Sequence, residues 1–267
     1  MPKEISTFIV DSFTDQAFKG NPAGVCLLEQ PLSDWEMQSI ATELNLSETA
    51  FLSQEQDHWN IRYFSPKMEI PLCGHATLAS AQVLVEKYAP ETIDFITGHG
   101  LKLKVKPEAE SLVMEFPRYR TCDAEIPAGM LQALGIDKAI NSVFNEETRI
   151  LMIEIESTKK LKELAPDFNA LLQTHDSLHG VLITTKGTEE YDFHSRYFWP
   201  WSGSNEDPVT GATHTFMAPY WGERLMKNKM KSFQASARTG FMDLELLDDQ
   251  LLIKGMAVMV LEGFFKI

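Results

Sequence analysis

The sequence contains few cysteines and no long hydrophobic segment. Its three cysteines, Cys26, Cys73 and Cys122, lie far apart, form no CxxC pair and leave an odd thiol. This pattern argues against a disulfide framework or a structural zinc site and indicates a reducing compartment. The longest apolar run, 256–261, is far shorter than the roughly 20 residues that cross a bilayer, and residues 1–10 lack the basic-then-apolar pattern of a signal peptide. We therefore expect a cytoplasmic protein that makes no membrane contact.

Basic residues are scarce relative to acidic ones. The 24 Lys and Arg residues stand against 38 Asp and Glu residues, for a formal charge of −14. Nucleic-acid affinity rests largely on neutralising phosphates with Lys and Arg, so we expect no nucleic-acid partner. The motifs GxxxxGKS/T, GxGxxG, HExxH and GxSxG are also missing. Their absence removes the usual support for nucleotide hydrolysis, dinucleotide-dependent hydride transfer, zincin proteolysis and α/β-hydrolase chemistry.

The length and the apolar patterns predict the organisation of the chain. Its 267 residues correspond to about two domains of ordinary size. Apolar spacing predicts a helix over 34–44 with Ser33 or Asp34 as N-cap, and the chain then turns extended, so Glu48 lies where a helix gives way to a strand. The predicted strands are 5–13, 25–28, 49–53, 59–64, 92–97, 101–105, 111–116, 149–155, 180–185, 192–199, 232–236, 241–247, 251–254 and 257–261. The other predicted helices are 78–88, 127–134, 168–174 and one that begins after the 207–214 turn and runs through Trp221, with a kink at Pro219.

Two junctions in the sequence look alike. The sequence GHAT at 74–77 resembles GATH at 211–214, and each copy follows extended chain and opens a predicted helix. This similarity predicts an internal duplication of mixed α+β halves, with two helix N-termini converging on one cleft. Such termini present unpaired N–H groups and a positive dipole, which suit a carboxylate or a phosphate. The alternative is that Gly and Thr at a helix start provide only capping.

Four side chains near these junctions are candidates for chemistry, and each has a structural alternative. Glu48 is a candidate proton-transfer group, although most glutamates are surface residues. Cys73 lies at a predicted helix N-terminus, where the helix dipole favours the reactive thiolate form of a cysteine, although most intracellular cysteines are inert. His75 is either a catalyst or a capping histidine. Asp207 precedes a proline, which holds it extended, and it is either a functional carboxylate or a cap.

Several segments, in this order along the chain, resemble the phenazine-biosynthesis-like (PhzF-like) isomerase family. They are GNPAGV at 20–25, LSETAF at 46–51, FSP at 64–66 with Glu69, LCGHATLA at 72–79 and EDPVTG at 206–211, followed by QASARTG at 234–240 and GMAV at 255–258. The resemblance covers nearly the whole chain. It implies an α+β fold similar to that of diaminopimelate epimerase, in which two pseudo-symmetric halves of mixed, barrel-like β-sheet each wrap around a central helix.

The resemblance also implies where the halves begin and end. The expected N-terminal half is 1–117, which the last strand at 257–267 would complete, and the expected C-terminal half is 118–256. The active site is expected in the cleft between them. The resemblance further implies a homodimer. The apolar segment 263–267 would suit either a dimer interface or a final core strand.

The activity that the resemblance implies is cofactor-independent isomerisation or epimerisation, in which a proton moves on a small, carboxylated metabolite. Glu48 matches the family's general acid/base, and His75 and Asp207 match polar groups that orient or reprotonate the substrate. The substrate-binding residues are expected to be Cys73, Gly74, Gly211, Ala212 and Thr213, with helix-start N–H groups holding the carboxylate. No metal and no cofactor are expected. A glutamate acts as both acid and base near neutral pH when a closed apolar cleft surrounds it.

Two departures from related patterns bear on the substrate. Two-thiol epimerases place a cysteine in each half, whereas this chain has Cys73 in the first half and Thr210 at the equivalent place in the second, which disfavours a two-thiol racemase. Ala212 stands where the phenazine-pathway enzyme has a hydroxyl-bearing serine, so the phenazine precursor is not the expected substrate. The hydroxyl of Thr213, the next residue, is a candidate to replace the missing one. Two alternatives stay open: a one-thiol epimerase that uses Cys73, and a non-catalytic protein that binds an anionic metabolite.

Overall fold

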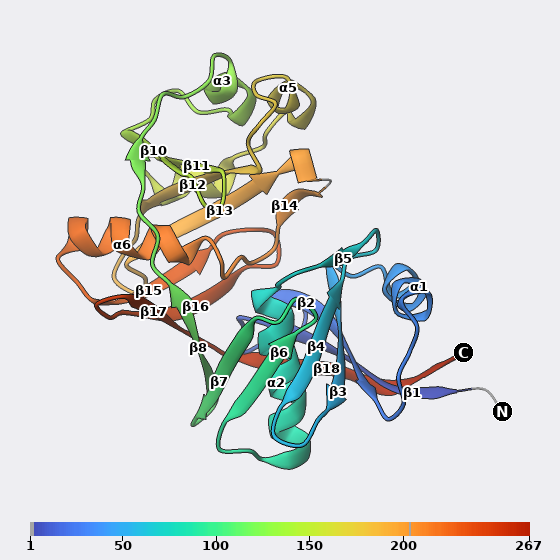
Figure 1. The fold of residues 1–267 in the computed structure, drawn as a ribbon. Coiled ribbons are helices and arrows are strands. Elements are labelled where there is room, and N and C mark those ends of the chain that lie inside the picture. Colours follow the sequence, from blue (N-terminus) through green and yellow to red (C-terminus); the bar gives the residue numbers. More distant parts are fainter. Residues whose placement is uncertain (1–2, 203) are drawn as a thin grey trace. The chain divides into compact units, whose positions relative to one another are not determined.

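The computed structural model describes residues 3–202 and 204–267, which form a mixed α+β protein (Figure 1). The chain divides into two units. The first comprises Met1–Glu115 and Leu252–Ile267, and the second comprises Phe116–Leu251. The last strand therefore belongs with the first part of the sequence. Within the described residues, no helix has the length and apolar character needed to cross a membrane.

The first unit is built on one continuous sheet. Its elements are β1 (Glu4–Ser12), β2 (Asn21–Leu28), α1 (Asp34–Leu44), β3 (Glu48–Gln54), β4 (Trp59–Phe64), β5 (Glu69–Ile70), α2 (Gly74–Tyr88), β6 (Ile93–Thr97), β7 (Lys102–Glu108), β8 (Ser111–Pro117) and β18 (Ala257–Lys266). The strands pair in the order β18–β1–β2–β3–β4–β6–β7–β8. The β2–β3 and β4–β6 pairs are parallel and the other pairs in this order are antiparallel.

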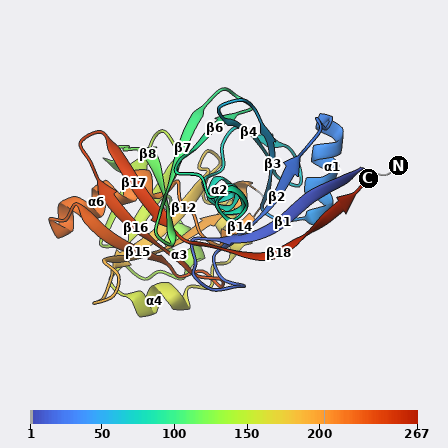
Figure 2. The ribbon, with the colours of Figure 1, turned by 90° about the horizontal axis from the view of Figure 1, so that it is seen from below.

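Two helices cover this sheet. Helix α2 contacts β1, β2, β3, β7 and β18, and Figure 2 shows it nearly end-on inside the curve of the strands, with α1 outside. Small side chains such as Ala76 and Ala79 let α2 be buried around most of its first half. On the outer face, Ile40 of α1 packs with Phe51 and Phe64 of the sheet. Alternate strand residues face opposite sides, so the sheet contributes to the packing of both helices.

The helix predicted at 34–44 is confirmed as α1, and its ends explain where Glu48 lies. The Ser33 hydroxyl accepts from the backbone N–H of Glu36 (3.2 Å), and the Glu36 carboxylate accepts from the backbone N–H of Ser33 (2.8 Å), which is a reciprocal capping box. At the other end, Asn45 is left-handed with φ of 50°. The chain then enters β3 at Glu48, so the predicted helix-to-strand transition is confirmed.

The second unit also contains a mixed sheet. Its elements are β9 (Cys122–Asp123), α3 (Met130–Leu134), β10 (Asn141–Asn145), β11 (Ile150–Glu154), α4 (Thr158–Glu163), α5 (Phe168–Leu172), β12 (Gly180–Lys186), β13 (Phe193–Trp199), β14 (Ser204–Asp207), α6 (His214–Leu225), β15 (Lys229–Gln234) and β16 (Gly240–Leu246). β17 (Gln250–Gly255) begins in this unit and continues into the first at Leu252. Strands pair in the order β9–β10–β11–β12–β13. The N-terminal part of β13 then pairs with β15, and its C-terminal part pairs with β14. β15 then pairs with β16.

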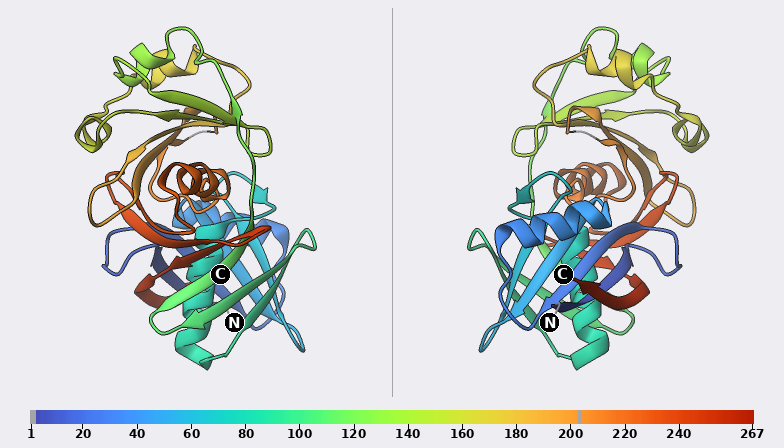
Figure 3. Two further views of the ribbon diagram at one scale, coloured as in Figure 1. Left: turned by 90° about the vertical axis from the view of Figure 1, so that its left-hand side faces the viewer. Right: turned by 90° about the vertical axis from the view of Figure 1, so that its right-hand side faces the viewer.

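Helix α6 is anchored in this unit by aromatic side chains. Figure 3 shows α6, in orange, nearly end-on among the strands of its unit. The Trp221 indole stacks on the ring of Phe193 at 5.9 Å between centroids, and its N–H donates to the Thr184 hydroxyl (3.0 Å). A buried indole N–H needs such a partner. The contacts tie α6 to β12 and β13, which lie directly before the segment that carries Asp207.

The structure differs from the sequence-based expectations mainly at short or turn-like segments. Helix α2 begins at Gly74 rather than at 78, because the Thr77 N–H already donates to the Cys73 carbonyl (3.0 Å) and closes the first turn. Helix α6 continues past Trp221 to Leu225. β10, α4 and β14 were not predicted, since they have only 5, 6 and 4 residues and their patterns are correspondingly short. Of these unpredicted elements, β14 matters most, because it carries Asp207.

The C-terminal segment 263–267 is mostly part of the final strand. β18 continues to Lys266 instead of stopping at 261, and pairs with β1. Phe265 packs against the cluster around α1, whereas Phe264 is 64% exposed. The segment therefore contributes to the core through alternate side chains, and the homodimer stays a prediction.

A glycine in the GNPAGV segment gives a test of this packing. Gly20 has φ of +67°, and a Cβ there would lie 2.1 Å from the Ser12 carbonyl oxygen; Gly100 has φ of +80°, but no atom of the described residues lies within 4 Å of its Cβ position. Gly100→Ala should cost about 1–2 kcal/mol, the strain of a left-handed alanine. Gly20→Ala should cost more, because the backbone must also move. Urea unfolding of both variants measures the difference, and equal losses would contradict the clash.

Candidate active site

Glu48 is a buried carboxylate at the start of β3. Its side chain is 11% exposed, and in the parallel pair of β2 with β3 its backbone lies opposite Ala23, which is fully buried. A charge removed from water is costly unless donors satisfy it. The surroundings of Glu48 therefore decide what the carboxylate can do.

His75 contacts this carboxylate from the first turn of α2. Its Nε2 lies 3.2 Å from Oε2 of Glu48, and the imidazole is 9% exposed. Burial lowers the pKa of His75 to about 4. The ring is therefore neutral near pH 7, and the contact is a hydrogen bond from a neutral imidazole instead of an ion pair with a charged one.

Asn21 determines which nitrogen of His75 carries the proton. The Asn21 side chain is fully buried at the start of β2, and its Nδ2 lies 3.3 Å from Nδ1 of His75. An amide nitrogen only donates, so with this amide orientation Nδ1 accepts and the proton of the neutral ring is on Nε2. The Nε2–H group then donates to Glu48. The backbone of the same histidine is held as well, since the Ser12 hydroxyl donates to its carbonyl (2.8 Å).

Cys73 completes this group of side chains. It is the N-cap residue of α2, with extended backbone at φ −146° and ψ 111°, and it is 8% exposed. Its Sγ lies 3.4 Å from Nδ1 and 3.9 Å from Nε2 of His75. Three of the predicted site residues, Glu48, Cys73 and His75, are thus brought together in the first unit, and Gly74, which is half-buried, is the first residue of the helix between the other two.

A buried hydroxyl pair supports the turn that carries Cys73. The Thr77 hydroxyl donates to the Cys73 carbonyl (2.7 Å), so in its 2.6 Å contact with Tyr63 it accepts and the phenol donates. Burial raises the pKa of Tyr63, which keeps the phenol protonated and able to donate. The start of α2 is therefore fixed by side chains from β4 and from its own first turn.

Glu48, Cys73 and His75 are also the one group in the described part of the chain whose ligand atoms suggest a metal, since they all lie within 4.8 Å of one another. Thiolate, imidazole and carboxylate are donors that zinc accepts. However, Glu48 meets His75 at Nε2, whereas the Cys73 sulfur lies closer to Nδ1. The same three side chains also contact one another directly as a hydrogen-bonded cluster.

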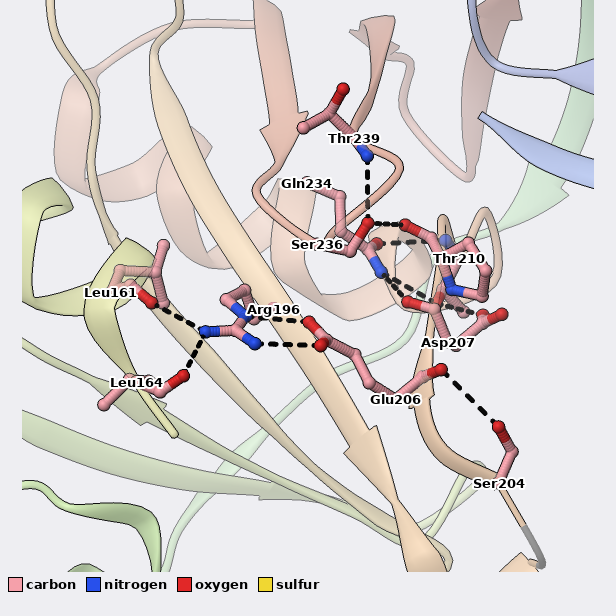
Figure 4. Close-up of polar contacts among 11 residues, drawn as sticks. Leu161, Leu164, Arg196, Ser204, Glu206, Asp207, Thr210, Gln234, Ser236 and Thr239 are labelled. Carbon is pink, nitrogen blue, oxygen red and sulfur yellow. Dashed lines mark hydrogen bonds and ion pairs between the residues drawn. The ribbon is translucent and has the colours of Figure 1, made fainter. Parts of the chain in front are cut away.

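Asp207 lies in the second unit, at the end of β14. It is 7% exposed, and its neighbour Glu206 points the other way, where it forms a two-bond fork with Arg196 (2.7 and 2.8 Å) (Figure 4). The Thr210 hydroxyl donates to Oδ2 of Asp207. Tyr197 of β13 lies opposite Asp207 in the strand pair, and burial together with the charge of Asp207 raises the pKa of this phenol. Thr210, which the sequence comparison expects at the place of the second cysteine of two-thiol epimerases, is therefore a hydrogen-bond donor to Asp207.

The remaining predicted residues lie on the turn that leads into α6. Gly211 and Thr213 are buried and Ala212 is exposed. The Thr213 hydroxyl donates to the Thr210 carbonyl (3.0 Å), and the Gly211 carbonyl accepts from the backbone N–H of the first helical residue, His214 (3.0 Å). The Thr213 hydroxyl is thus used to build the turn.

His214 is a second buried histidine at a helix start, but its ring serves a different purpose. Its Nδ1 lies 3.0 Å from the Thr210 carbonyl, so Nδ1 carries the proton, and its Nε2 accepts from the Ser232 hydroxyl (2.8 Å). Burial lowers the pKa of His214 to about 4. Both ring nitrogens are bonded to structural groups of the second unit, which makes this ring a brace between the turn and β15.

Sequence reasoning missed several residues that hold the predicted ones in place. Asn21 lies in a motif that was used for the family resemblance, but no role was inferred for it. Gln234 opens the QASARTG segment and contacts both Asp207 and Thr210. A buried amide side chain inside a motif is the signal that points to such residues, because a buried amide needs polar partners.

Comparison with known proteins identifies the family. The model of the PhzC-PhzF family, described as phenazine biosynthesis-like protein, matches residues 10–263. The chain belongs to the PhzC-PhzF family. An uncharacterized isomerase of Halalkalibacterium halodurans is 43% identical over 262 residues, which cover 96% of this chain and 96% of that protein. Close relatives are named isomerases, and the family expected from the sequence motifs is confirmed.

Solved structures of the PhzC-PhzF family and of epimerases share the fold. The crystal structure of a PhzF-family phenazine biosynthesis protein of Enterococcus faecalis superposes with a TM-score of 0.93 at 37% identity, covering 99% of this chain and 100% of that one. A hydroxyproline epimerase of Agrobacterium vitis has a TM-score of 0.66 at 10% identity, covering 99% of this chain and 93% of that one. The epimerase comparison concerns the fold alone. The expected mixed α+β class, related to epimerases, is confirmed.

The two buried histidines at helix starts, His75 and His214, predict a specific loss of stability in acid. Their pKa values of about 4 in the folded chain lie below the ordinary value of 6.5, so between these pH values the unfolded chain binds more protons. Stability therefore falls as the pH drops from about 6.5 to about 4, by on the order of 3 kcal/mol per histidine. His214→Asn should be less stable near pH 7 but show a weaker decline. Urea unfolding across this range tests it, with exposed His99→Gln as the control that keeps the full decline.

Proposed function

We propose that this chain is an isomerase that moves a proton on a small carboxylic acid without a cofactor, with Glu48 as the general acid and base. The observation that carries the proposal is the contact between the buried Glu48 carboxylate and the neutral imidazole of His75, 3.2 Å apart. Membership of a family whose relatives are named isomerases supports the reaction class. A buried carboxylate beside a helix start is suited to this chemistry, because general acid–base catalysis needs a group that can gain and lose a proton near neutral pH.

The proposed step conserves atoms and electrons. The Glu48 carboxylate removes a proton from a carbon next to an electron-withdrawing group, and the electron pair of the broken C–H bond moves into that group to give an enolate. The protonated Glu48 then returns the proton to the same or to another carbon, and the electron pair of the enolate forms the new C–H bond. No oxidation or reduction takes place. The developing negative charge needs hydrogen-bond donors already in place.

The neutrality of His75 matters to this step. A charged imidazolium next to Glu48 would stabilise the carboxylate and make it a weaker base. A neutral Nε2–H group orients the carboxylate with less stabilisation of its charge. Asn21 supports this state, because its amide nitrogen, 3.3 Å from Nδ1, leaves the ring proton on Nε2.

The proposed substrate class is a small acid whose carboxylate is held by helix-start N–H groups. Gly74 opens α2, which has 15 residues, and 211–213 precede α6. Backbone N–H groups and the positive end of a helix together favour an anion. Because the Thr213 hydroxyl already donates to the Thr210 carbonyl, we assign Thr213 to the substrate through its backbone N–H and not as a substitute for the missing serine.

The two units are interpreted as halves of one duplicated fold, each with a mixed sheet around a helix. The Gly-Thr segment forms the first turn of α2 in the first unit and directly precedes α6 in the second. The match of 206–211 to the family motif EDPVTG supports the proposal that Asp207 of the second unit takes part in the same reaction as Glu48. Asp207→Asn should therefore lose activity on the same substrate on which a Glu48 variant loses it.

A one-thiol epimerase remains the second candidate, and one observation favours it. The Cys73 sulfur is 3.4 Å from Nδ1 of His75 at the start of α2, so an imidazole nitrogen lies within reach of the thiol proton. A binding protein for an anionic metabolite is the non-enzymatic alternative. It would have no use for a proton-transfer carboxylate bonded to a neutral imidazole.

The test of Glu48 is incorporation of solvent deuterium. The chain is incubated in deuterium oxide with a panel of small hydroxy, amino and cyclic unsaturated acids, and labelling is followed by mass spectrometry and NMR. Glu48→Gln should lower the labelling rate at least about 100-fold, the usual contribution of general acid–base catalysis, while the fold is kept because the amide has the same shape. Exposed Glu43→Gln is the matched control and should label like the wild type. Undiminished labelling by Glu48→Gln would refute the assignment.

The choice between Glu48 and Cys73 needs a separate comparison. Cys73→Ala leaves the Glu48–His75 contact in place, so we expect labelling within about tenfold of the wild type. The exposed Cys122→Ala is the control for loss of a thiol. If Cys73→Ala abolishes labelling while Glu48→Gln keeps it, the one-thiol epimerase is the correct mechanism. Binding of a panel acid with no labelling by the wild type would favour the binding protein.

A further inference from the structure

Gln234 joins the two ends of the turn that carries Asp207. It lies at the end of β15 and is 2% exposed. Its Nε2 donates to the Asp207 carbonyl (2.7 Å), and its Oε1 accepts from the backbone N–H of Thr210 (3.0 Å). Figure 4 shows the amide lying across the turn, between the backbone of Asp207 and that of Thr210.

The turn needs this outside partner because of its own sequence. Pro208 has no N–H, and it holds Asp207 in extended conformation. A buried backbone group left without a hydrogen-bond partner destabilises the folded chain. A side-chain amide carries a donor and an acceptor together, so one residue can satisfy a carbonyl at one end of the turn and an N–H at the other.

The same amide lies next to the hydroxyl that contacts the Asp207 carboxylate. The Thr210 hydroxyl donates to Oδ2 of Asp207, and Nε2 of Gln234 lies 3.5 Å from that hydroxyl oxygen. The backbone of Thr210, which Gln234 holds, therefore sets the direction from which the carboxylate receives its hydrogen bond. Displacing the backbone of Thr210 would move the donor away from Asp207.

A second brace on the turn is independent of Asp207 and Thr210. The Ser236 hydroxyl donates to the Pro208 carbonyl (2.6 Å) and accepts from the backbone N–H of Thr239 (3.1 Å). Ser236 therefore supports the middle of the turn, whereas Gln234 supports its two ends. The two residues belong to one segment, so they form a matched pair for an experiment.

We propose that Gln234 is a positioning residue for the reaction, which holds the 207–210 turn so that the Thr210 hydroxyl stays on Asp207 and the carboxylate keeps one orientation. The inference rests on the proposed function, in that it takes Asp207 to act on the substrate. It extends that function to a side chain 27 residues away in the chain. Gln234 acts through the turn and does not itself need to touch the substrate.

The first experiment measures kcat and KM for the panel acid that the wild type labels. Gln234→Leu should lower kcat by about 100-fold, the effect expected when a catalytic group is displaced by about 1 Å, with a smaller change in KM. Ser236→Ala should stay within about threefold of the wild type. Amide hydrogen exchange at Thr210, followed by NMR without substrate, should become faster in Gln234→Leu and stay slow in Ser236→Ala. An unchanged kcat in Gln234→Leu, or an equal loss in Ser236→Ala, would overturn the proposal.

A conservative variant adds a signature that a packing role would not produce. In Gln234→Glu, the protonated carboxylic acid has one donor and one acceptor, whereas the carboxylate has no donor. The ratio of its kcat to that of the wild type should therefore rise as the pH is lowered from about 7 to about 5, with circular dichroism confirming the fold at each pH. A ratio that does not change with pH contradicts the proposed role of the amide donor.

Asp207→Asn separates failure of this inference from failure of the proposed function. If Asp207→Asn labels the acid at the wild-type rate, Asp207 is not part of the reaction, and the proposed function and this inference are both wrong on that point. If Asp207→Asn is inactive while Gln234→Leu is fully active, the role of Asp207 stands and only the positioning by Gln234 is refuted.

Discussion

The hydrogen bond between the neutral His75 imidazole and the buried Glu48 carboxylate is the interaction on which the rest of the candidate site depends. A carboxylate that is 11% exposed needs a donor, and a charged donor would hold it in its ionised form. Burial keeps His75 neutral, Asn21 directs its proton toward Glu48, and the Ser12 hydroxyl of β1 holds its backbone carbonyl. The sheet, the start of α2 and the Asn21 amide thus serve one purpose. They hold the Glu48 carboxylate in place and leave it able to act as a base.

The two buried histidines at helix starts show how similar motifs can serve different ends. His75 and His214 both lie at helix starts and both have a pKa lowered to about 4 by burial. His75 is the second residue of its helix, whereas His214 is the first. This shift places one ring against Glu48 and the other between the Thr210 carbonyl and the Ser232 hydroxyl. In the second unit the candidate group Asp207 lies at the start of the turn before the helix, held by the Thr210 hydroxyl and by Gln234 of β15.

Much of the fold could be predicted from local sequence patterns. The N-cap candidates and apolar spacing of α1, the alternation of the strands and the 207–214 turn are local signals, and they led to the correct elements and to the position of Glu48 at the start of β3. The start of α2 at Gly74 was missed because GHAT by itself has no strong helical pattern. It becomes the first helical turn through the hydrogen bond from the Thr77 N–H to the Cys73 carbonyl. The four-residue strand β14 was missed because it depends on pairing with β13 and not on its own periodicity.

The sequence by itself determined the family, through motifs spread along the whole chain, and the residue types that carry the candidate chemistry: Glu48, Cys73, His75 and Asp207. Only the tertiary structure decided which groups hold them. Asn21 meets His75 across 54 residues, and Gln234 meets Asp207 across 27. Such partners are set by strand register and by where a helix begins, and a shift of one residue in register turns a side chain to the opposite face. Local patterns indicate strands and helices, but the hydrogen bonds between them form only once the sheets have paired.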